Sequence, residues 1–290
     1  MTTILPLVVG VDGSPGSLTA VDWAVDEAAR HGAPLRLVHG THDAHHTRVT
    51  RTADPARHGR ADRIVALAAE RARRRNPSVD VSTDVVPADP VDALLSAGDH
   101  ASALVTGARG LGEAAGLLLG SVGLAVASRA RCPVVVVRGD PAGLAGRHDR
   151  ILLGAGEPAG GGAAVRFAFR EAEARGCELD AVRAWRRPAR DGGDHGRPAG
   201  APDRPHEEEA RARLDDLLGP VAAEHPGVRV RRTAVQGPAR KVLVQRSAAA
   251  DLVVVGAHRR PGALGPRLGR VAHTLLHHAE APVAVIPQEP

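Results

Sequence analysis

The sequence predicts an α/β protein in which parallel strands alternate with helices and the whole pattern occurs twice. Short apolar runs alternate with longer amphipathic segments, which is typical of a doubly wound parallel sheet with right-handed crossovers. Hydrophobic residues make up 43% of the 290 residues and aromatic residues only 1%, so Val, Leu, Ile and Ala must build the core, as in parallel sheets. From about residue 151 the order of elements starts again.

The first half opens with an apolar run at 4–11, which is typical of a central strand covered on both faces. Ser14 and Pro15 suit the start of a helix that ends at His31, because a hydroxyl caps the first turn and proline fits the first helical position. Further strands are expected at 35–39, 79–86, 103–106 and 133–138, and further helices at about 62–75, at 91–97 and after Ser121.

The second half repeats this order after a turn-rich segment at 140–143. Strands are expected at 151–155, 179–185, 228–235, 252–256 and 283–287, and helices at 163–174, up to 224, at 239–248 and near 269–279. The carboxyl-terminal ends of the two halves align best in sequence, with Pro133 aligned to Pro282. This duplication predicts a boundary near 139–148 and two domains, at 1–140 and 148–290.

Composition argues against several classes of function. The net charge is +5, but the arginines are interspersed with acidic residues and aromatic residues are too few for a nucleic-acid stacking platform. Cys132 and Cys177 have no second cysteine nearby and are interpreted as small core residues in a reducing compartment. The N-terminus lacks a basic signal-peptide region, and the longest uncharged run, 114–128, is too short to span a bilayer. We expect a cytoplasmic protein that contacts neither nucleic acid nor membrane.

A glycine-rich stretch between the fourth strand and the next helix has the spacing of an anion site. Gly107, Gly110 and Gly120 follow the pattern G-x2-G-x9-G, and Ser121 comes directly after them. Bare glycine amides, a hydroxyl and the positive end of a helix dipole together bind phosphate without a lysine. Any one of these glycines could simply end a strand or a turn, but the set of four favours a phosphate cradle. Asp12, Gly40 and the loop after Thr106 all follow strands whose ends converge in such a sheet.

These residues resemble the tandem-domain universal stress proteins of actinobacteria. The resemblance is carried by VVGVDGSPGSLTAVDWAVDEAARHGAPLRLVHG at 8–40, by the glycine-serine signature and by CPVVVVR at 132–138. It is specific in the first half and weaker in the second. It implies a five-stranded flavodoxin-like sheet of the adenine nucleotide alpha hydrolase type in each domain. It also implies ATP at the strand ends in many members and dimerisation through the fifth strand.

The resemblance implies particular ligand contacts in the first half. Asp12 matches an acidic residue near the adenosine, Gly40 a backbone position at the adenine edge, and Thr106 and Gly107 the ribose side. The complete set of expected nucleotide contacts is Asp12, Gly13, Ser14, Gly40, Thr106, Gly107, Arg109, Gly110, Gly120, Ser121 and Val122. Glu113 departs from the family pattern and is expected to point into solvent.

The second half lacks most of this set. Gly156 stands where the first half has Asp12, Arg259 where it has Gly110, and Arg270 where it has Ser121. The motif is therefore degenerate there, and we expect a structural or regulatory partner domain.

Three functions stay open. The first is an ATP-binding regulatory module in the stress response, with Mg2+ bound through the phosphates and an unidentified protein partner. The second is a slow ATPase or a phosphoryl or adenylyl transferase that uses the same pocket. This enzyme reading is less favoured because the first half has no Walker lysine and no evident base. The third is a nucleotide-free scaffold, against which the intact signature argues.

The histidines do not provide a metal template. Those at 39, 42, 45, 46 and 58 fit no fixed ligand spacing and are interpreted as a solvated loop. His273, His277 and His278 are interpreted as part of a surface helix, although His273 and His277 are four residues apart.

The two fifth strands, Val134–Val137 and Val283–Ile286, are apolar although they lie at sheet edges. An open apolar edge invites uncontrolled pairing, so we expect it to be covered. The sequence predicts that the two edges pair antiparallel and form one ten-stranded sheet within the chain, which leaves a homodimer open as a further state.

Overall fold

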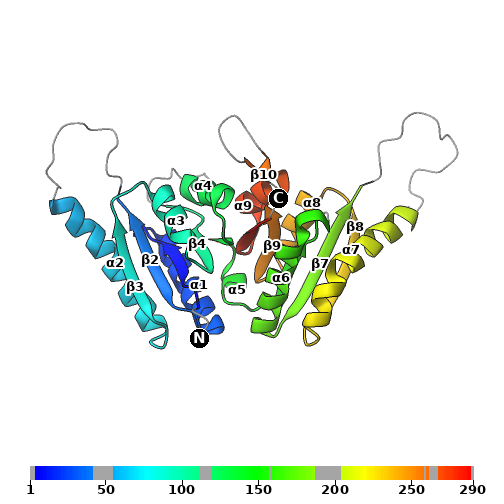
Figure 1. Cartoon of the computed structure of the whole chain (residues 1–290), viewed down its shortest axis with the longest axis horizontal. Coiled ribbons are helices and arrows are strands. Elements are labelled where there is room, and N and C mark those ends of the chain that lie inside the picture. Colours follow the sequence, from blue (N-terminus) through cyan, green and yellow to red (C-terminus); the bar gives the residue numbers. More distant parts are fainter. Residues whose placement is uncertain are drawn as a thin grey trace.

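The computed structural model describes residues 4–41, 55–110, 119–156, 158–186, 204–257, 259–260 and 267–288. In the first half, strands and helices alternate as predicted (Figure 1). The elements are β1 (Leu7–Gly10), α1 (Pro15–His31), β2 (Leu35–Gly40), α2 (Pro55–Arg75), β3 (Val81–Val86), α3 (Pro90–Gly98), β4 (Ala103–Gly107), α4 (Ser121–Arg129) and β5 (Val134–Val137).

A short helix, α5 (Pro141–Leu144), lies between the halves. The second half then repeats the order of elements. They are β6 (Arg150–Gly154), α6 (Pro158–Arg175), β7 (Glu178–Trp185), α7 (Arg204–Glu224), β8 (Val230–Gln236), α8 (Ala239–Ser247), β9 (Leu252–Ala257), β10 (Arg259–Arg260), β11 (Arg267–Leu268), α9 (Arg270–His278) and β12 (Val283–Pro287).

One ten-stranded sheet runs through the molecule, in the order β3-β2-β1-β4-β5-β12-β9-β6-β7-β8. Within each half the strands are parallel, and β5 and β12 are antiparallel. This is the ten-stranded arrangement that the sequence predicts. The unpredicted β10 and β11 form a separate antiparallel pair.

Two apolar layers, one on each face of the sheet, form the core. The face covered by α1, α2, α6 and α7 contains Val135 and Val137, and the face covered by α3, α4, α8 and α9 contains Val134 and Val136. Each layer includes buried residues from both halves. The side chains of β5 therefore alternate between the two layers, as expected for a strand covered on both faces.

The seam between the halves is the β5–β12 pairing, with Val136 opposite Val283 and Val134 opposite Val285. On the other side of β5, Leu104 donates its amide to the carbonyl of Pro133, and Ala108 donates to that of Val137. Odd-numbered β5 residues thus turn their backbone groups to β4, because backbone direction alternates along a strand. The even-numbered Val136 turns its amide toward the seam.

Asp140 and Asp251 fix the segment that links the halves. The Asp140 side chain caps α5 by accepting the amide of Gly143 at 2.8 Å. Asp251, which is buried, accepts the amides of His148 (2.9 Å) and Arg150 (3.2 Å). The end of the linker is therefore attached to the second half by hydrogen bonds from its backbone amides to the Asp251 carboxylate.

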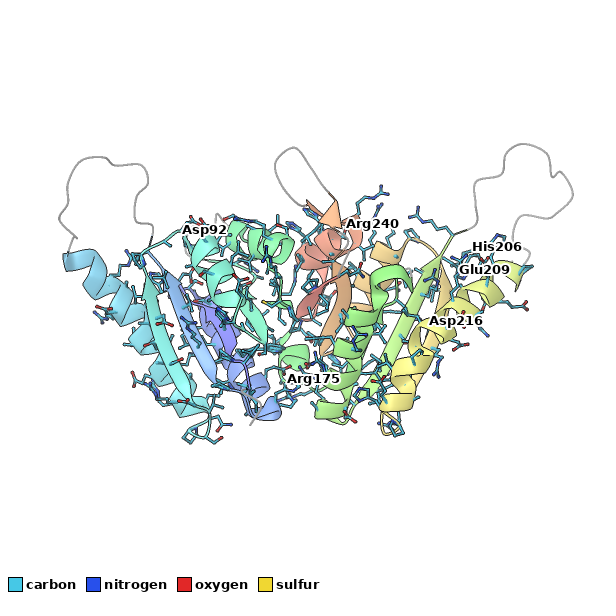
Figure 2. All side chains as sticks on the ribbon, in the orientation of Figure 1. Asp92, Arg175, His206, Glu209, Asp216 and Arg240 are labelled. Carbon is cyan, nitrogen blue, oxygen red and sulfur yellow. The ribbon has the colours of Figure 1, made fainter. Side chains whose placement is uncertain are left out.

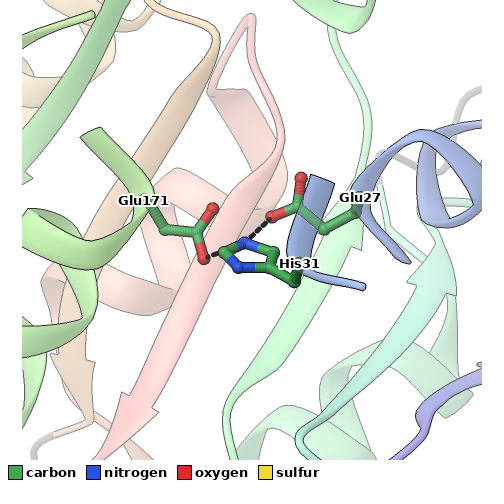
Figure 3. A group of neighbouring side chains, drawn as sticks. All are labelled: Glu27, His31 and Glu171. Atoms are coloured by element: carbon green, nitrogen blue, oxygen red, sulfur yellow. Dashed lines mark ion pairs between the residues drawn. The ribbon is translucent and has the colours of Figure 1, made fainter. Parts of the chain in front are cut away.

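A group of charged residues, buried except for His31, joins α1 to α6 at the same junction. Arg175 lies near the middle of the molecule, between the two halves (Figure 2). Its guanidinium donates to Glu27 Oε2 at 2.7 Å and to Glu171 Oε2 at 3.1 Å. His31 Nε2 lies 3.4 Å from Glu27 Oε1 and 3.2 Å from Glu171 Oε1 (Figure 3). We call these four residues the junction cluster.

The junction cluster shifts the acidities of its members. Hydrogen bonds with Glu171 and Glu27 raise the pKa of His31 to about 9. Burial and the charge of Glu27 raise the pKa of Glu171 to about 7. Burial also acts to raise the pKa of Glu27, but Arg175 and His31 outweigh it and hold that pKa well below its usual range. Near neutral pH, one cationic histidine and one arginine thus share two buried carboxyl groups.

The structure differs from the sequence prediction mainly at element ends. The first apolar run begins at residue 4, but Ile4 and Leu5 are exposed and β1 begins at Leu7. Helix α2 begins at Pro55, earlier than the apolar pattern indicates, since its first two turns have few apolar residues. Cys132 and Cys177 are buried and free, as predicted. Among the helices of the described ranges, none combines the length and apolar content that crossing a membrane requires.

Candidate functional site

A cavity of about 500 Å³ lies at the carboxyl ends of β1, β2 and β4. This is where a doubly wound sheet binds its ligands, and the volume suits a small organic molecule. The walls come from the strand ends, from α2 and α3, and from the start of α4. The lining residues are Gly10, Val11, Asp12, Ser17, Val38, His39, Gly40, Thr41, Arg60, Ala61, Ile64, Pro90, Leu94, Thr106, Gly107, Arg109, Gly110, Gly120, Ser121, Val122 and Gly123.

The structure brings most of the sequence-predicted site residues to this cavity. All of the predicted contacts except Gly13 and Ser14 line it. Ser14 is buried, accepts the amide of Ser17 at 3.1 Å as the cap of α1, and donates to the carbonyl of Arg109 at 3.3 Å. Gly13 has φ +83°, a conformation that suits glycine at the turn into α1. Both residues shape the loop beneath the cavity.

Two of the lining glycines are explained by close backbone approach. A Cβ at Gly40 would lie 2.6 Å from the Cα of Pro90, and a Cβ at Gly107 would lie 2.5 Å from the backbone of Gly16. These contacts bring the start of α3 and the first turn of α1 against the strand ends. A glycine is needed at each position for packing, whether or not a ligand is present.

Gly110 is different, because the atom nearest to it belongs to a cavity side chain. A Cβ there would lie 2.6 Å from Oδ2 of Asp12. The Asp12 carboxylate is oriented by the amide of Ser14, which donates to Oδ1 at 2.9 Å. Gly110 therefore leaves room for a fixed carboxylate that lines the cavity.

The start of α4 supplies amide donors to the same cavity. Gly120 is the N-cap and makes no side-chain cap hydrogen bond, and its own amide donates to the carbonyl of Ala108 at 2.7 Å. The amides of Ser121, Val122 and Gly123 belong to the first turn, where a helix offers no internal acceptor. These amides and the helix dipole favour a negatively charged group.

The floor of the cavity includes a buried hydroxyl without a partner. Thr106 Oγ1 is buried and has no hydrogen-bond partner among the described residues. A Cβ at Gly123 would lie 3.2 Å from this oxygen, so the small residue lets α4 approach it closely. A buried polar atom without a partner is costly, and a ligand hydroxyl or phosphate could satisfy it.

The cavity has an apolar side and a cationic side. Apolar lining residues are Val38, Ile64, Pro90 and Leu94. Arg60 and Arg109 also line the cavity. Burial, together with the positive charge of Arg109, lowers the pKa of Arg138. This arrangement suits a ligand with a flat apolar part and an anionic part.

His39, predicted both to end a strand and to belong with the histidines of a solvated loop, also lines the cavity. It lies in β2, and its Nδ1 donates to the carbonyl of Val11 at 2.7 Å, because a carbonyl can only accept. That bond fixes the ring, and it leaves Nε2 free to accept in the neutral tautomer. Of the other histidines expected in that loop, His58 lies in α2 instead, and those at 42, 45 and 46, together with Glu113, lie outside the described residues.

The family model for the universal stress protein family matches residues 4–138 and 148–287. The chain belongs to the universal stress protein family. A universal stress protein of Mycobacterium tuberculosis is 35% identical over 97% of this chain and 97% of its own length. A universal stress protein of Mycolicibacterium smegmatis is 32% identical over 97% of this chain and 96% of its own length. The chain thus matches full-length tandem relatives.

Solved universal stress proteins share the fold. A crystal structure from Archaeoglobus fulgidus aligns with a TM-score of 0.71 and 18% identity, and it covers 97% of this chain and 98% of that one. The α/β prediction is therefore confirmed. A universal stress protein in complex with cAMP aligns over 47% of this chain and 98% of its own, with 33% identity and a TM-score of 0.37.

The second universal stress protein domain fills the equivalent position with side chains. Strand register matches His39 of the first domain with Arg183 of the second, since Gly10 pairs with Val38 and Gly154 with Val182. Arg183 is buried and donates to the carbonyl of Gly156 at 2.5 Å. It therefore crosses the strand ends at the position where the first domain has its cavity.

Two other features of the second domain support the comparison. Leu243 covers Gly154 as Leu94 covers Gly10. At the end of β9, however, Gln288 crowds Gly256 so closely that a Cβ there would lie 2.1 Å from its Nε2. Of the predicted substitutions, Arg270 begins α9, and the Arg259 side chain lies outside the described residues.

Sequence reasoning missed the residues that helices bring to the cavity. Arg60 and Ile64 come from α2, Leu94 comes from α3, and Ser17 comes from α1. No local motif identifies them, because their positions depend on how each helix docks on the sheet. Gly10 is a missed lining residue that the sequence could have indicated. It comes directly before Val11 and Asp12, at the end of a predicted strand, where glycine often allows close approach of a ligand or another chain segment.

Proposed function

We propose that the first domain binds an adenine nucleotide, ATP in the first instance, and acts as a nucleotide-dependent regulatory module. The observation that carries this proposal is the cavity at the ends of β1, β2 and β4. It combines first-turn amides of α4, for which the helix itself offers no acceptor, glycines at its wall and the Thr106 hydroxyl, which has no hydrogen-bond partner among the described residues. An anionic ligand with a hydroxyl-bearing part would satisfy these groups together.

The two sides of the cavity suit the two ends of a nucleotide. The apolar side, with Val38 and Leu94, favours a flat base, and the α4 start with Ser121 and Arg109 favours phosphates. Mg2+, when bound, would neutralise phosphate charge. Asp12 is the one carboxylate among the described lining residues and would be the protein group available to the ion or its water shell.

We further propose that nucleotide binding is confined to one of two domains, at 1–140 and 148–290. Arg183 and Gln288 stand at the strand ends of the second domain, where the first domain has its open cavity. One nucleotide per chain is expected. The second domain then serves as a structural or regulatory partner across the β5–β12 seam.

Gly110→Ala tests the site, because its new methyl would meet the Asp12 carboxylate inside the cavity. Calorimetric titration with Mg-ATP should show one site per chain in the native protein and at least tenfold weaker binding in the variant, on the order of 1.4 kcal/mol. The matched control is Gly219→Ala on α7, where an added Cβ meets no atom within 4 Å. It should bind as the native protein does.

Equal affinity for Mg-ATP in Gly110→Ala and native protein would contradict the assignment of the nucleotide to this cavity, provided that both proteins have the same melting temperature. Two equivalent sites per chain would contradict the confinement to one domain. Incubation of the complex followed by nucleotide analysis then separates binding from catalysis. Unchanged ATP after many hours supports a regulatory module, and steady conversion supports the enzyme alternative.

A further inference from the structure

The junction cluster contains three metal-ligating side chains that come from both domains. Glu27 and His31 lie on α1, and Glu171 lies on α6. One ligand atom from each lies within 4.8 Å of the other two. In Figure 3 the imidazole ring of His31 lies between the two carboxylates. We propose that Glu27, His31 and Glu171 form a zinc-binding site at the domain junction.

The duplication shows what is unusual about this cluster. Helices α1 and α6 both end before a glycine in the left-handed conformation, Gly32 with φ +61° and Gly176 with φ +64°. His31 precedes the first and Arg175 the second, so they occupy equivalent positions, as do Glu27 and Glu171. An arginine at both positions would make a symmetric ion-pair cluster. The histidine replaces one cation by a group that can bind a metal, which arginine cannot.

The distances fit a metal bound by nitrogen and oxygen. His31 Nε2 lies 3.4 Å from Glu27 Oε1 and 3.2 Å from Glu171 Oε1. Two ligand atoms about 2.0–2.2 Å from a tetrahedral zinc are separated by about 3.3 Å. Two of the three pairs of donor atoms thus lie near the spacing that zinc requires, and the carboxylate oxygens of Glu27 and Glu171 lie within 4.8 Å of each other.

Arg175 orients the carboxylates for this purpose. It donates hydrogen bonds to Oε2 of Glu27 and to Oε2 of Glu171, so that each carboxylate presents its other oxygen to His31. Hydrogen bonds of this kind fix the ligands around many metal sites. Because both carboxylates are buried and held from behind, they need little reorganisation to bind an ion.

The exposure of His31 and the types of donor atom suit an exchangeable zinc ion. Arg175 and Arg30 already balance the two carboxylates, so zinc must take the place of the His31 proton. The His31 side chain is 34% exposed, which gives an ion access and leaves a position for water. A donor set of one imidazole and two carboxylates favours zinc over magnesium or calcium.

The test is zinc titration of the full chain after chelator treatment, in competition with a chromogenic zinc chelator at pH 7.5. Native protein should bind one more equivalent of zinc than His31→Arg does. His31→Arg is a matched control, because it places at residue 31 the side chain that already fits at the equivalent residue 175. Histidines elsewhere in the chain are unchanged in the variant, so the difference isolates this site.

Zinc should also raise the melting temperature of native protein, and this rise should be lost in His31→Arg and reduced in Glu171→Gln. Equal stoichiometry and affinity in native protein and His31→Arg would overturn the proposal. If His31→Arg does not fold, cobalt decides the matter on native protein alone. Tetrahedral Co2+ should give intense visible bands that zinc abolishes and that Glu171→Gln lacks, and a native spectrum without such bands overturns the site.

Discussion

Removing the guanidinium of Arg175 should destabilise the native protein more than any single surface change. Its side chain is 9% exposed, and those of Glu27 and Glu171 are each 6% exposed. Arg175→Met keeps the length of the side chain but leaves the buried carboxyl group of Glu171 with His31 alone and that of Glu27 with His31 and Arg30. Breaking a buried ion pair in this way costs about 3–5 kcal/mol, and here one cation serves two acids. We expect a loss in that range at pH 8.

The loss should become smaller at lower pH. Without Arg175, the pKa of Glu171, already about 7 in the native cluster, rises further above its unfolded value. A group whose folded pKa is raised contributes stability that is lost as pH rises through the folded pKa. Protonation of Glu171 at pH 5.5 removes one of the two buried charges. The difference between native protein and Arg175→Met should therefore be larger at pH 8 than at pH 5.5.

Urea unfolding of chelator-treated protein, followed by tryptophan fluorescence, measures this difference. The two tryptophans report on different halves, and Trp23 is the one next to the cluster, with the Arg175 guanidinium 5.9 Å from its ring centre. Glu27→Gln, Glu171→Gln and Arg175→Met combined should recover most of the stability, because no unpaired charge stays buried. An Arg175→Met variant that unfolds at the native urea midpoint at pH 8 would refute the reasoning, since the carboxylates would then be well solvated.

Two further predictions concern the seam and the thiols. Val136→Pro should open the β5–β12 seam, because it removes an amide that faces β12, and hydrogen exchange of Val283 and Val285 should then speed up. Val136→Ala, which keeps the amide, is the control, and equally slow exchange in both variants would contradict the assigned direction of that amide. Cys132 and Cys177 are buried, and burial raises the pKa of Cys177, so a thiol reagent at pH 8 should modify both slowly in native protein and at once in urea. Immediate reaction of either thiol in native buffer would show that it is accessible.

Local pattern was enough to predict the strands of the ten-stranded sheet and the helices that cover it, though not α5, β10 or β11, because each strand of a two-sided sheet needs a short apolar run and each covering helix an apolar face. It also predicted the β5–β12 pairing, since the valines at 134–137 leave no solvent-tolerant face and must be covered on both sides and along the edge. The apolar pattern failed at Ile4 and Leu5, which continue the run but lie outside the strand. Hydrophobicity alone does not indicate at which residue the hydrogen bonding between neighbouring strands begins.

The candidate site was predictable only where backbone geometry demands glycine. Gly40 and Gly107 sit where another main chain passes within van der Waals range, and Gly110 sits against a carboxylate, so each leaves a signal in the sequence. Arg60 and Ile64 reach the cavity through the docking of α2, and no spacing rule links them to Asp12. The junction cluster was missed for the same reason, because Glu27 and Glu171 meet only after two distant helices pack.

The two halves of this chain show which constraints the fold imposes and which it leaves free. Apolar strand residues and helix-end glycines recur in both, because the ten-stranded sheet requires them on each side of the seam. The residues that differ lie where packing leaves a choice: Arg183 against His39 at the strand ends, and Arg175 against His31 at the junction. In both places one domain has a histidine, whose charge depends on its protonation, and the other has an arginine, whose charge is permanent. A symmetric dimer of identical chains could not make this distinction, because any substitution would appear on both sides of its axis. Fusing the two domains into one chain removes that restriction, so that residues at equivalent positions can differ between the two sides.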